Sequence, residues 1–594
     1  MNNQPETGRV VVVDATTGSV TDYPLQETVR LGYLGGSCLA SRLWLESTRL
    51  EVDPLSAANT LVIAPGLLTG FPVPHAGRTS LAAKSPLTGL LSDSSAGGSF
   101  GARLKALGVA ALVIKGAFDE PSYIVIDGEE RGVRLEKAGI LWGQDVFFTY
   151  EALKERHGER AEAAIIGPAG ENGVYFASVV FCGARPGSAS RTGMGAVMGS
   201  KNLKAVLVRG DRSLVPRDPR GLEEAVAEFL ARTRETASKG NPGSRSSMPL
   251  HALRLLPARN WREGTDPGVY GPPGAEVLGQ GVTLEAFGAF GPLCLVKEPR
   301  YISLGSETCL KMGLDLISAG SAAAFAMEAY ERGIIGDEDA GRALTWGDGE
   351  AVLFILDEIV NQQGLGSLLS RGTRAAAAKL GPLAGEFAVH VKGLEVPVYD
   401  PRVIPGLAVF YATGSRGACH LDGLSRYILA GEHPDGRAGV GGFLEAQDAG
   451  EIAGMAIRMQ DLSMALDSLG LYKSILHAAV STREIARWVE CCLGTRFAAE
   501  DLHRAGERSF TLRRLCNVAL GITRKDDFLP PRLLSHPRHP AEGGSLPYLG
   551  EMLHEYYASR GWDQEGLPTV RTLEKLELTG YPKWLGIRTK VLTG

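Results

Sequence analysis

The spacing of apolar residues changes at about residue 210, and this change constrains the fold of the 594-residue chain more than any other feature. Before it, short apolar runs rich in Val and Ile alternate with Gly, Pro and Asp turns, which is typical of strands. After it, from Leu222 onward, apolar residues recur at helical spacing in long segments. Strands followed by helices, rather than alternating with them, indicate an α+β fold.

The length indicates several domains, because a single hydrophobic core stops growing beyond about 250–300 residues. We expect a β-rich domain at 1–210, a helical domain at 211–389 and a second helical domain at 390–594. Residues 239–300 are rich in Gly, Pro, Ser and Arg without a clear period, which predicts a loop-rich segment in the second domain. No internal repeat is evident in the sequence.

Charge and composition exclude several classes of function. The formal net charge is only −5 and no basic block is present, so we expect no nucleic-acid partner. No apolar run is long enough to span a bilayer, and the polar N-terminus lacks a secretory signal pattern, which predicts a cytoplasmic protein without a membrane partner. The eight cysteines include no C-x-x-C pair, so their spacing indicates no metal site.

Residues 191–204, RTGMGAVMGSKNLK, combine glycines with cationic side chains. Backbone N–H groups opened by glycine, together with Arg and Lys, form an arrangement suited to a phosphate. A dinucleotide-binding fingerprint does not fit, because the next apolar run begins at Ala205 and leaves no room for a crossover helix. We interpret the stretch as a site for a different phosphate-bearing cofactor, with a structural turn as the alternative.

Two further regions carry glycines next to polar residues. Gly77-Arg78, 84–89 and 94–101 could bind a phosphate through an arginine and backbone amides, although the sequence alone favours a pair of surface turns. Residues 312–315 and 467–472 each place a Gly-Leu pair at the end of a helical pattern. A single such glycine is typical of a helix C-cap, but its repetition is unusual.

His420 lies in the loop sequence Arg416-Gly417-Ala418-Cys419-His420. A histidine in a glycine-containing loop is suited to acid–base work or to donating a hydrogen bond to a substrate. A structural histidine is the equally simple alternative.

These motifs, in this order, resemble the tungsten-containing aldehyde ferredoxin oxidoreductase family. The likeness covers nearly the whole chain except about residues 235–308. The stretches that carry it are 8–18, 53–56, 66–70, 84–89, 166–172, 195–204, 399–402, 416–420, 467–471, 529–532 and 556–562.

The resemblance implies a β-rich N-terminal domain with pseudo-two-fold symmetry that holds a tungsten or molybdenum bis-pterin cofactor, covered by two mainly helical domains. In that family the dithiolene sulfurs of the pterins bind the metal, so no protein metal ligand is expected. A magnesium ion between the pterin phosphates is compatible with the resemblance. His420 matches the family's active-site histidine. The positions that match cofactor contacts are Arg78, Ser95, Gly97, Arg191, Asp315, Asp467 and Leu471.

The chain also departs from the family's pattern. The family holds a [4Fe–4S] cluster with C-x-x-C-x-x-x-C and a fourth cysteine in the second Gly-Leu turn. Here only Cys294 remains near the first group and Tyr472 stands at the fourth position, so we predict that the cluster is absent. Leu310 replaces the acidic residue that opens the first turn, and Ser95 stands where the family usually has Asn. No residue matches the family's active-site glutamate, because Glu307 does not fit the motif.

Three functions remain open at this point. The first, which we favour, is oxidation of an aldehyde to a carboxylic acid, with the electrons passed to a ferredoxin-like protein or a cluster-bearing subunit. The second is a pterin-binding paralogue or partner subunit without redox turnover. The third is non-redox chemistry, such as hydration, at a metal–pterin site. The metal, the aldehyde and a homo- or hetero-oligomeric state are not fixed by the sequence.

Overall fold

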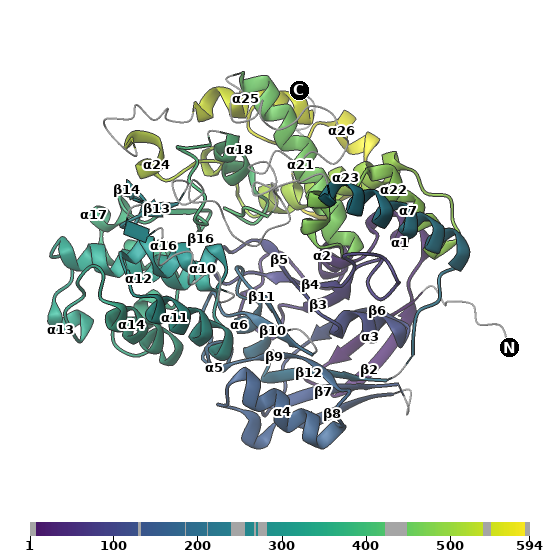
Figure 1. Cartoon of the computed structure of the whole chain (residues 1–594), viewed down its shortest axis with the longest axis horizontal. Helices are drawn as coiled ribbons and strands as arrows, with labels where there is room; N and C mark the ends of the chain where they lie inside the picture. Colours follow the sequence, from purple (N-terminus) through teal and green to yellow (C-terminus); the bar gives the residue numbers. More distant parts are fainter. Residues whose placement is uncertain are drawn as a thin grey trace.

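Two mixed β-sheets form the N-terminal part of the molecule, and helices cover them from two sides (Figure 1). The computed structural model describes residues 8–128, 132–183, 186–210, 212–238, 256–266, 269–270, 282–404, 406–421, 448–537 and 548–587. None of the helices in these ranges is long and apolar enough to cross a membrane.

Each sheet has six strands. The first contains β1 (Arg9–Asp14), β2 (Ser19–Pro24), β3 (Leu61–Pro65), β4 (Arg78–Lys84), β5 (Leu91–Gly97) and β6 (Val109–Lys115), in the order β2-β1-β6-β3-β4-β5. The second contains β7 (Ser122–Asp127), β8 (Gly132–Lys137), β9 (Glu162–Ile166), β10 (Val179–Cys182), β11 (Gly187–Ala189) and β12 (Leu203–Arg209), in the order β11-β10-β9-β12-β7-β8.

The second sheet repeats the topology of the first. Adding six to each strand number of the first sheet gives β8-β7-β12-β9-β10-β11. This is the order of the second sheet read from its other edge. The pairing directions repeat as well: β1–β6 and β7–β12 are parallel, and the other pairs of each sheet are antiparallel. A short helix follows the fifth strand in both halves, α3 (Phe100–Ala106) and α6 (Met194–Gly199). The structure therefore contains a repeat of topology that the sequence does not reveal.

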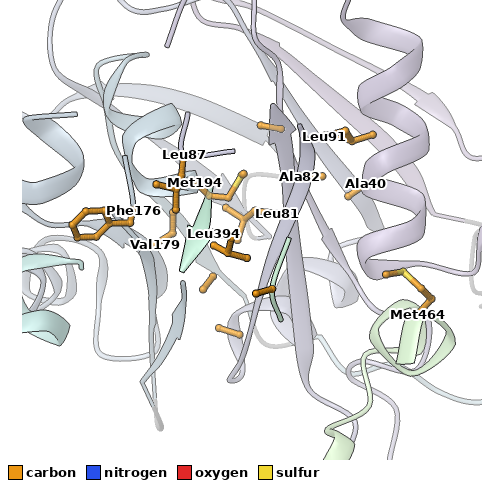
Figure 2. Close-up of a cluster of buried hydrophobic side chains, with 14 of the residues drawn as sticks. Ala40, Leu81, Ala82, Leu87, Leu91, Phe176, Val179, Met194, Leu394 and Met464 are labelled. Atoms are coloured by element: carbon orange, nitrogen blue, oxygen red, sulfur yellow. The ribbon is translucent and has the colours of Figure 1, made fainter. Parts of the chain in front are cut away.

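Strand β4 contributes to the core from both of its faces. Successive strand residues point to opposite sides, and Figure 2 shows Leu81 and Ala82 doing so. Leu81 lies toward Val179 and Met194 of the second half, whereas Ala82 lies toward α2 (Gly36–Ser47). The central strands are buried on both faces, which explains why they are continuous apolar runs rather than alternating ones.

The helices form two groups (Figure 1). One contains α10 (Leu284–Phe290), α11 (Pro299–Met312), α12 (Leu316–Glu331), α14 (Gly349–Asn361) and α16 (Thr373–Leu380). The other contains α18 (Gly406–Thr413), α21 (Ala449–Leu469), α22 (Thr482–Leu493), α23 (Ala499–Ala519) and α25 (Leu549–Arg560).

Two elements differ from the division drawn on the sequence. Helix α7 (Pro219–Ser238) packs beside α22 of the C-terminal group, where Arg232 Nη2 lies 2.9 Å from Glu484 Oε1. Helix α10 lies inside the stretch predicted to be loop-rich, and the Thr283 hydroxyl accepts a hydrogen bond from Ala286 N (3.2 Å) at its start. The remaining parts of that stretch, 239–255, 267–268 and 271–281, lie outside the described residues.

Candidate active site

The two Gly-Leu turns dock at equivalent places on the two sheets. Leu314 of the first turn forms a β-bridge with Ala177, in the connection from β9 to β10. Leu471 of the second turn forms one with Ala76, in the connection from β3 to β4. Because β3 and β9 are equivalent strands, the motif occurs twice for a structural reason: each half of the β-rich domain receives one turn.

Glycine is required where these turns meet the sheets. A Cβ atom added at Gly66, directly after β3, would lie 2.2 Å from Gly470 Cα. A Cβ atom added at Gly167, directly after β9, would lie 2.4 Å from Met312 O. Two backbones therefore touch at each docking point, and only glycine permits this approach.

Each turn brings a carboxylate to one arginine. Asp315 accepts a hydrogen bond from Ser318 N (2.9 Å) at the start of α12, and its Oδ2 lies 3.3 Å from Arg191 Nη1. Asp467 Oδ1 lies 3.8 Å from Arg78 Nε in the other half. The four predicted charged contact residues thus form two pairs, one in each half of the domain.

The strands that carry these pairs lie side by side. Arg78 Nη2 donates to Ser95 O (2.9 Å), which places Ser95 and the neighbouring Gly97 at the first pair. Ser94 and Thr192 place their hydroxyl oxygens 2.7 Å apart, which joins β5 to the segment that carries Arg191. The structure therefore brings the predicted cofactor contacts of both halves into one region.

Tyr472 fills space at the first pair. A Cβ atom added at Gly97 would lie 1.6 Å from Tyr472 Oη, and the Arg78 guanidinium lies 5.7 Å from the centre of the tyrosine ring. The residue at the family's fourth cysteine position therefore packs its ring against a predicted cofactor-contact glycine. All eight cysteines are buried and unpaired by disulfides, and no group of three His, Cys, Asp or Glu side chains among the described residues could hold a metal ion.

The lysines of 191–204 do not line an anion site. Lys201 Nζ donates to Gly116 O (2.9 Å) and Ala57 O (3.2 Å), and Lys204 is fully buried against Glu171. Burial lowers the pKa of Lys201 to about 8. The expectation that these two lysines surround a phosphate is therefore wrong, because their ammonium groups already bind oxygen atoms of the protein.

The glycines of the same stretch serve close packing. A Cβ atom at Gly195 would lie 2.5 Å from Ser178 O, and one at Gly199 would lie 2.0 Å from Gly170 O. Helix α6 thus lies directly on the connection between β9 and β10. Of the cationic residues that suggested a phosphate site, Arg191 is the one that lies beside the carboxylate of a Gly-Leu turn, that of Asp315.

Several polar atoms of this region fit a polar cofactor. Arg78 Nε, Arg191 Nε, Asp467 Oδ1 and Ser178 Oγ are buried without a hydrogen-bond partner among the described residues. A buried polar atom without a partner costs about 1–3 kcal/mol. The two guanidinium groups suit an anionic group such as a pterin phosphate, and the Asp467 carboxylate oxygen suits a hydrogen-bond donor of the same cofactor.

His420 is buried beside a glutamate that sequence reasoning missed. Its Nε2 lies 3.5 Å from Glu285 Oε1 at the start of α10, and its ring packs on the ring of Tyr399 at 5.2 Å between centres. Tyr399 also donates its hydroxyl to Glu285 Oε1 (2.8 Å). The signal for this glutamate is the N-capping Thr283, which begins a helix inside the stretch that we interpreted as loop.

The pair is electrostatically asymmetric. Burial alone would raise the pKa of Glu285, but the hydrogen bond and charge of His420 and the Tyr399 hydroxyl outweigh it and lower that pKa to about 2. Burial lowers the pKa of His420; Glu285 opposes this shift, and the charges of Arg191 and Lys473 add to it. The arrangement favours an ionised Glu285 beside a neutral imidazole at neutral pH.

Duplicated sheets, one aspartate-bearing turn docked on each, and a buried His–Glu pair are the features that distinguish this candidate site. The family model for "Aldehyde ferredoxin oxidoreductase, N-terminal domain" matches residues 10–210, and the model for its domains 2 and 3 matches residues 265–578. The chain belongs to the aldehyde ferredoxin oxidoreductase family.

Relatives match over nearly full length. The tungsten-containing aldehyde ferredoxin oxidoreductase of Pyrococcus furiosus is 32% identical, with 97% of this chain and 99% of the relative covered. That of Thermococcus kodakarensis is 33% identical with the same coverage. The WOR-like subunit of an aliphatic sulfonate oxidoreductase from Pyrococcus furiosus is 28% identical over 96% of both chains.

A solved structure shares the fold. It is the active-site complex BamBC of benzoyl coenzyme A reductase in complex with 1,5-dienoyl-CoA. The TM-score is 0.86 at 25% identity, with 99% of each chain covered. The prediction of an α+β fold with a β-rich N-terminal domain followed by helical domains is confirmed.

Proposed function

We propose that this oxidoreductase oxidises an aldehyde to a carboxylic acid at a tungsten (or molybdenum) bis-pterin cofactor. The observation that carries the proposal is the pairing of Arg78 with Asp467 and of Arg191 with Asp315 at equivalent places of two equivalent halves. A site built twice suits a cofactor with two similar pterins. The names of the relatives support tungsten and an aldehyde substrate.

In this proposal the paired residues bind the cofactor. The arginines bind its anionic groups, the turns present Asp315, Asp467 and Leu471 to its rings, and Ser95 and Gly97 line the first half. A magnesium ion between the phosphates is compatible with this set. When bound, the cofactor supplies a centre that accepts two electrons.

In the proposed reaction His420 accepts a proton and Glu285 stabilises the protonated imidazole. Oxidation of an aldehyde to a carboxylic acid takes one oxygen atom from water and releases two electrons and two protons. A neutral, buried imidazole accepts one of these protons, and the carboxylate 3.5 Å away stabilises the imidazolium that results. The ring of Tyr399 fixes the orientation of the imidazole.

The electrons leave through a partner. Because Tyr472 occupies the fourth cysteine position, we propose that the chain carries no [4Fe–4S] cluster and that a ferredoxin-like protein or a cluster-bearing subunit accepts the electrons. A cytoplasmic location is part of this proposal. The same packing of Tyr472 against Gly97 favours, as the second candidate, a pterin-binding subunit without turnover of its own.

Metal and pterin analysis tests the proposal. Protein purified from a host that makes the cofactor should contain tungsten or molybdenum, two pterins per metal by fluorescence of the released oxidised pterin, and little iron. It should reduce a viologen dye when an aldehyde is added.

Other outcomes of the same analysis separate the alternatives. Cofactor without aldehyde-dependent reduction would support the second candidate. Neither metal nor pterin would contradict both, and four iron atoms per chain with a cluster signal in electron paramagnetic resonance would contradict the missing cluster.

A further inference from the structure

Lys473 is buried directly after the second Gly-Leu turn and uses all three of its N–H bonds. Its Nζ donates to Leu421 O (2.8 Å), Ser463 Oγ (2.7 Å) and Asp467 Oδ2 (2.9 Å). Only 5% of the side chain is exposed. The first acceptor belongs to the residue after His420, and the other two belong to α21.

Arg191 makes the corresponding link from the other half. Its Nη2 donates to Ala418 O (2.8 Å), two residues before His420, while its Nη1 faces Asp315 of the first turn. Each cation is therefore paired with the aspartate of one turn and also bound to a carbonyl that flanks His420. The loop 418–421 is held at both of its ends.

We propose that Lys473 is a positioning residue, which fixes the loop carrying His420 to the second Gly-Leu turn and thereby sets the place and charge state of the imidazole. This inference deepens the proposed function and rests on it only where turnover is measured. The seating of the second turn on its sheet is transmitted to the loop that carries His420 through Lys473, which binds both Asp467 and Leu421 O.

The charges around His420 give the proposal a measurable sign. Three charged groups act on the imidazole: Glu285 from α10 favours its protonation, and Arg191 from the β-rich domain and Lys473 after the second turn oppose it. The titratable hydroxyl of Tyr399 belongs to the ring that packs on the imidazole and donates to Glu285. Removal of the charge of Lys473 therefore raises the pKa of His420. An activity that needs the neutral imidazole falls at low pH, where the imidazole is protonated. This acidic limb of the pH profile therefore moves to higher pH.

The test compares Lys473→Gln, Lys473→Arg and the exposed control Lys575→Met. Each protein is expressed with 13C-labelled histidine and purified, and the titration of His420 is followed by NMR. The His420 signal is assigned as the one that is lost in His420→Asn. We expect the midpoint to move to higher pH in Lys473→Gln and to stay at the wild-type value in Lys473→Arg and in the control. This measurement needs no turnover, so it reads out independently of the proposed function.

Kinetics of the cofactor-loaded protein give the second measurement. Per loaded site, Lys473→Gln should lower kcat about tenfold or more, the loss of about 1.4 kcal/mol of transition-state stabilisation, and move the acidic limb upward. Lys473→Arg should recover most of kcat. A purely structural lysine would change the loaded fraction and the melting temperature but leave the acidic limb in place.

Two results would overturn the inference. One is a His420 midpoint and an acidic limb that stay at the wild-type pH in folded Lys473→Gln. The other, which decides the matter if the Gln variant does not fold, is a His420 midpoint that shifts in Lys473→Arg although the charge is kept. Absence of aldehyde oxidation by wild-type protein would instead contradict the proposed function and leave the NMR result standing.

Discussion

At the scale of single residues, the charges of the site are held in close opposite pairs. Arg78 faces Asp467 and Arg191 faces Asp315, while Glu285 faces the imidazole of His420, which becomes its counter-charge only when it is protonated. A charge taken out of water is stable only with a partner, and removal of one member leaves the other uncompensated. The buried pairs therefore fix both the position and the charge state of the groups that we assign to cofactor and substrate.

Glu285→Gln should lower kcat for aldehyde oxidation about 100-fold, because the imidazolium formed in the reaction loses its counter-charge. Since Glu285 favours protonation of His420, its neutralisation lowers the pKa of the imidazole, and the acidic limb of the kcat profile should move to lower pH. The control is Glu307→Gln, whose side chain is 54% exposed on α11. Equal pH profiles for the two variants would contradict the role of Glu285.

Sequence motifs selected several residues that the structure brings together, and their role in cofactor binding stays a prediction. The predicted contacts Arg78, Arg191, Asp315 and Asp467 all lie at the docked turns. Lys201 and Lys204 misled, because a sequence displays a cation but not the carbonyl or carboxylate that already binds it. Glu285 was missed because its partner His420 is 135 positions away, and no local pattern links the two.

At the scale of elements, the turns and the sheets form the site through contact of backbone with backbone. Two backbone hydrogen bonds join the second turn to the first sheet: Leu67 N donates to Ser468 O (3.0 Å), and Leu68 N donates to Leu469 O (2.8 Å). Such docking leaves no room for a side chain. The sequence displayed the repeated Gly-Leu turn, but not that each copy serves one sheet, because strand order depends on pairing across the whole domain.

Gly66→Ala should separate the second turn from the first sheet, because its Cβ would lie 2.2 Å from Gly470 Cα. Overpacking of this kind costs about 1–3 kcal/mol, and we expect a lower melting temperature and less bound pterin per chain. Gly385→Ala is the matched control, since a Cβ there meets nothing within 4 Å. Retention of wild-type pterin content by Gly66→Ala would show that docking of the turn is not needed for the cofactor.

At the scale of the whole molecule, one large hydrophobic core joins both sheets and both groups of helices, and a second, smaller core lies between the second sheet and α4 (Val146–His157). A single cluster of buried side chains runs from Val10 in β1 to Leu578 near the C-terminal end of the described residues. It includes Leu81 of the first sheet, Val179 of the second and Met464 of the C-terminal helices, and Figure 2 shows Leu81 between the other two. The domains predicted from apolar spacing therefore share their interior.

Thermal unfolding of the cofactor-free protein should give a single main calorimetric transition, because the large core is shared by both sheets and both groups of helices. Ile63→Ala in β3 removes a fully buried side chain, costs about 2–5 kcal/mol and should shift the whole transition to lower temperature. Leu383→Ala, at a side chain that is 63% exposed, should leave it unchanged. A separate low-temperature transition that alone responds to Ile63→Ala would contradict a shared core.

The repeated strand order of the two sheets has an evolutionary consequence. A domain of two topologically equal halves joined edge to edge, with β5 beside β11, has the form of an ancestral homodimer whose subunits became one chain. Strand pairing depends on backbone hydrogen bonds, so the two halves share one strand order although their sequences show no repeat. The His420–Glu285 pair of this candidate site comes from the helical parts of the chain and lies outside the repeat, so the site is less symmetric than the two sheets beside it.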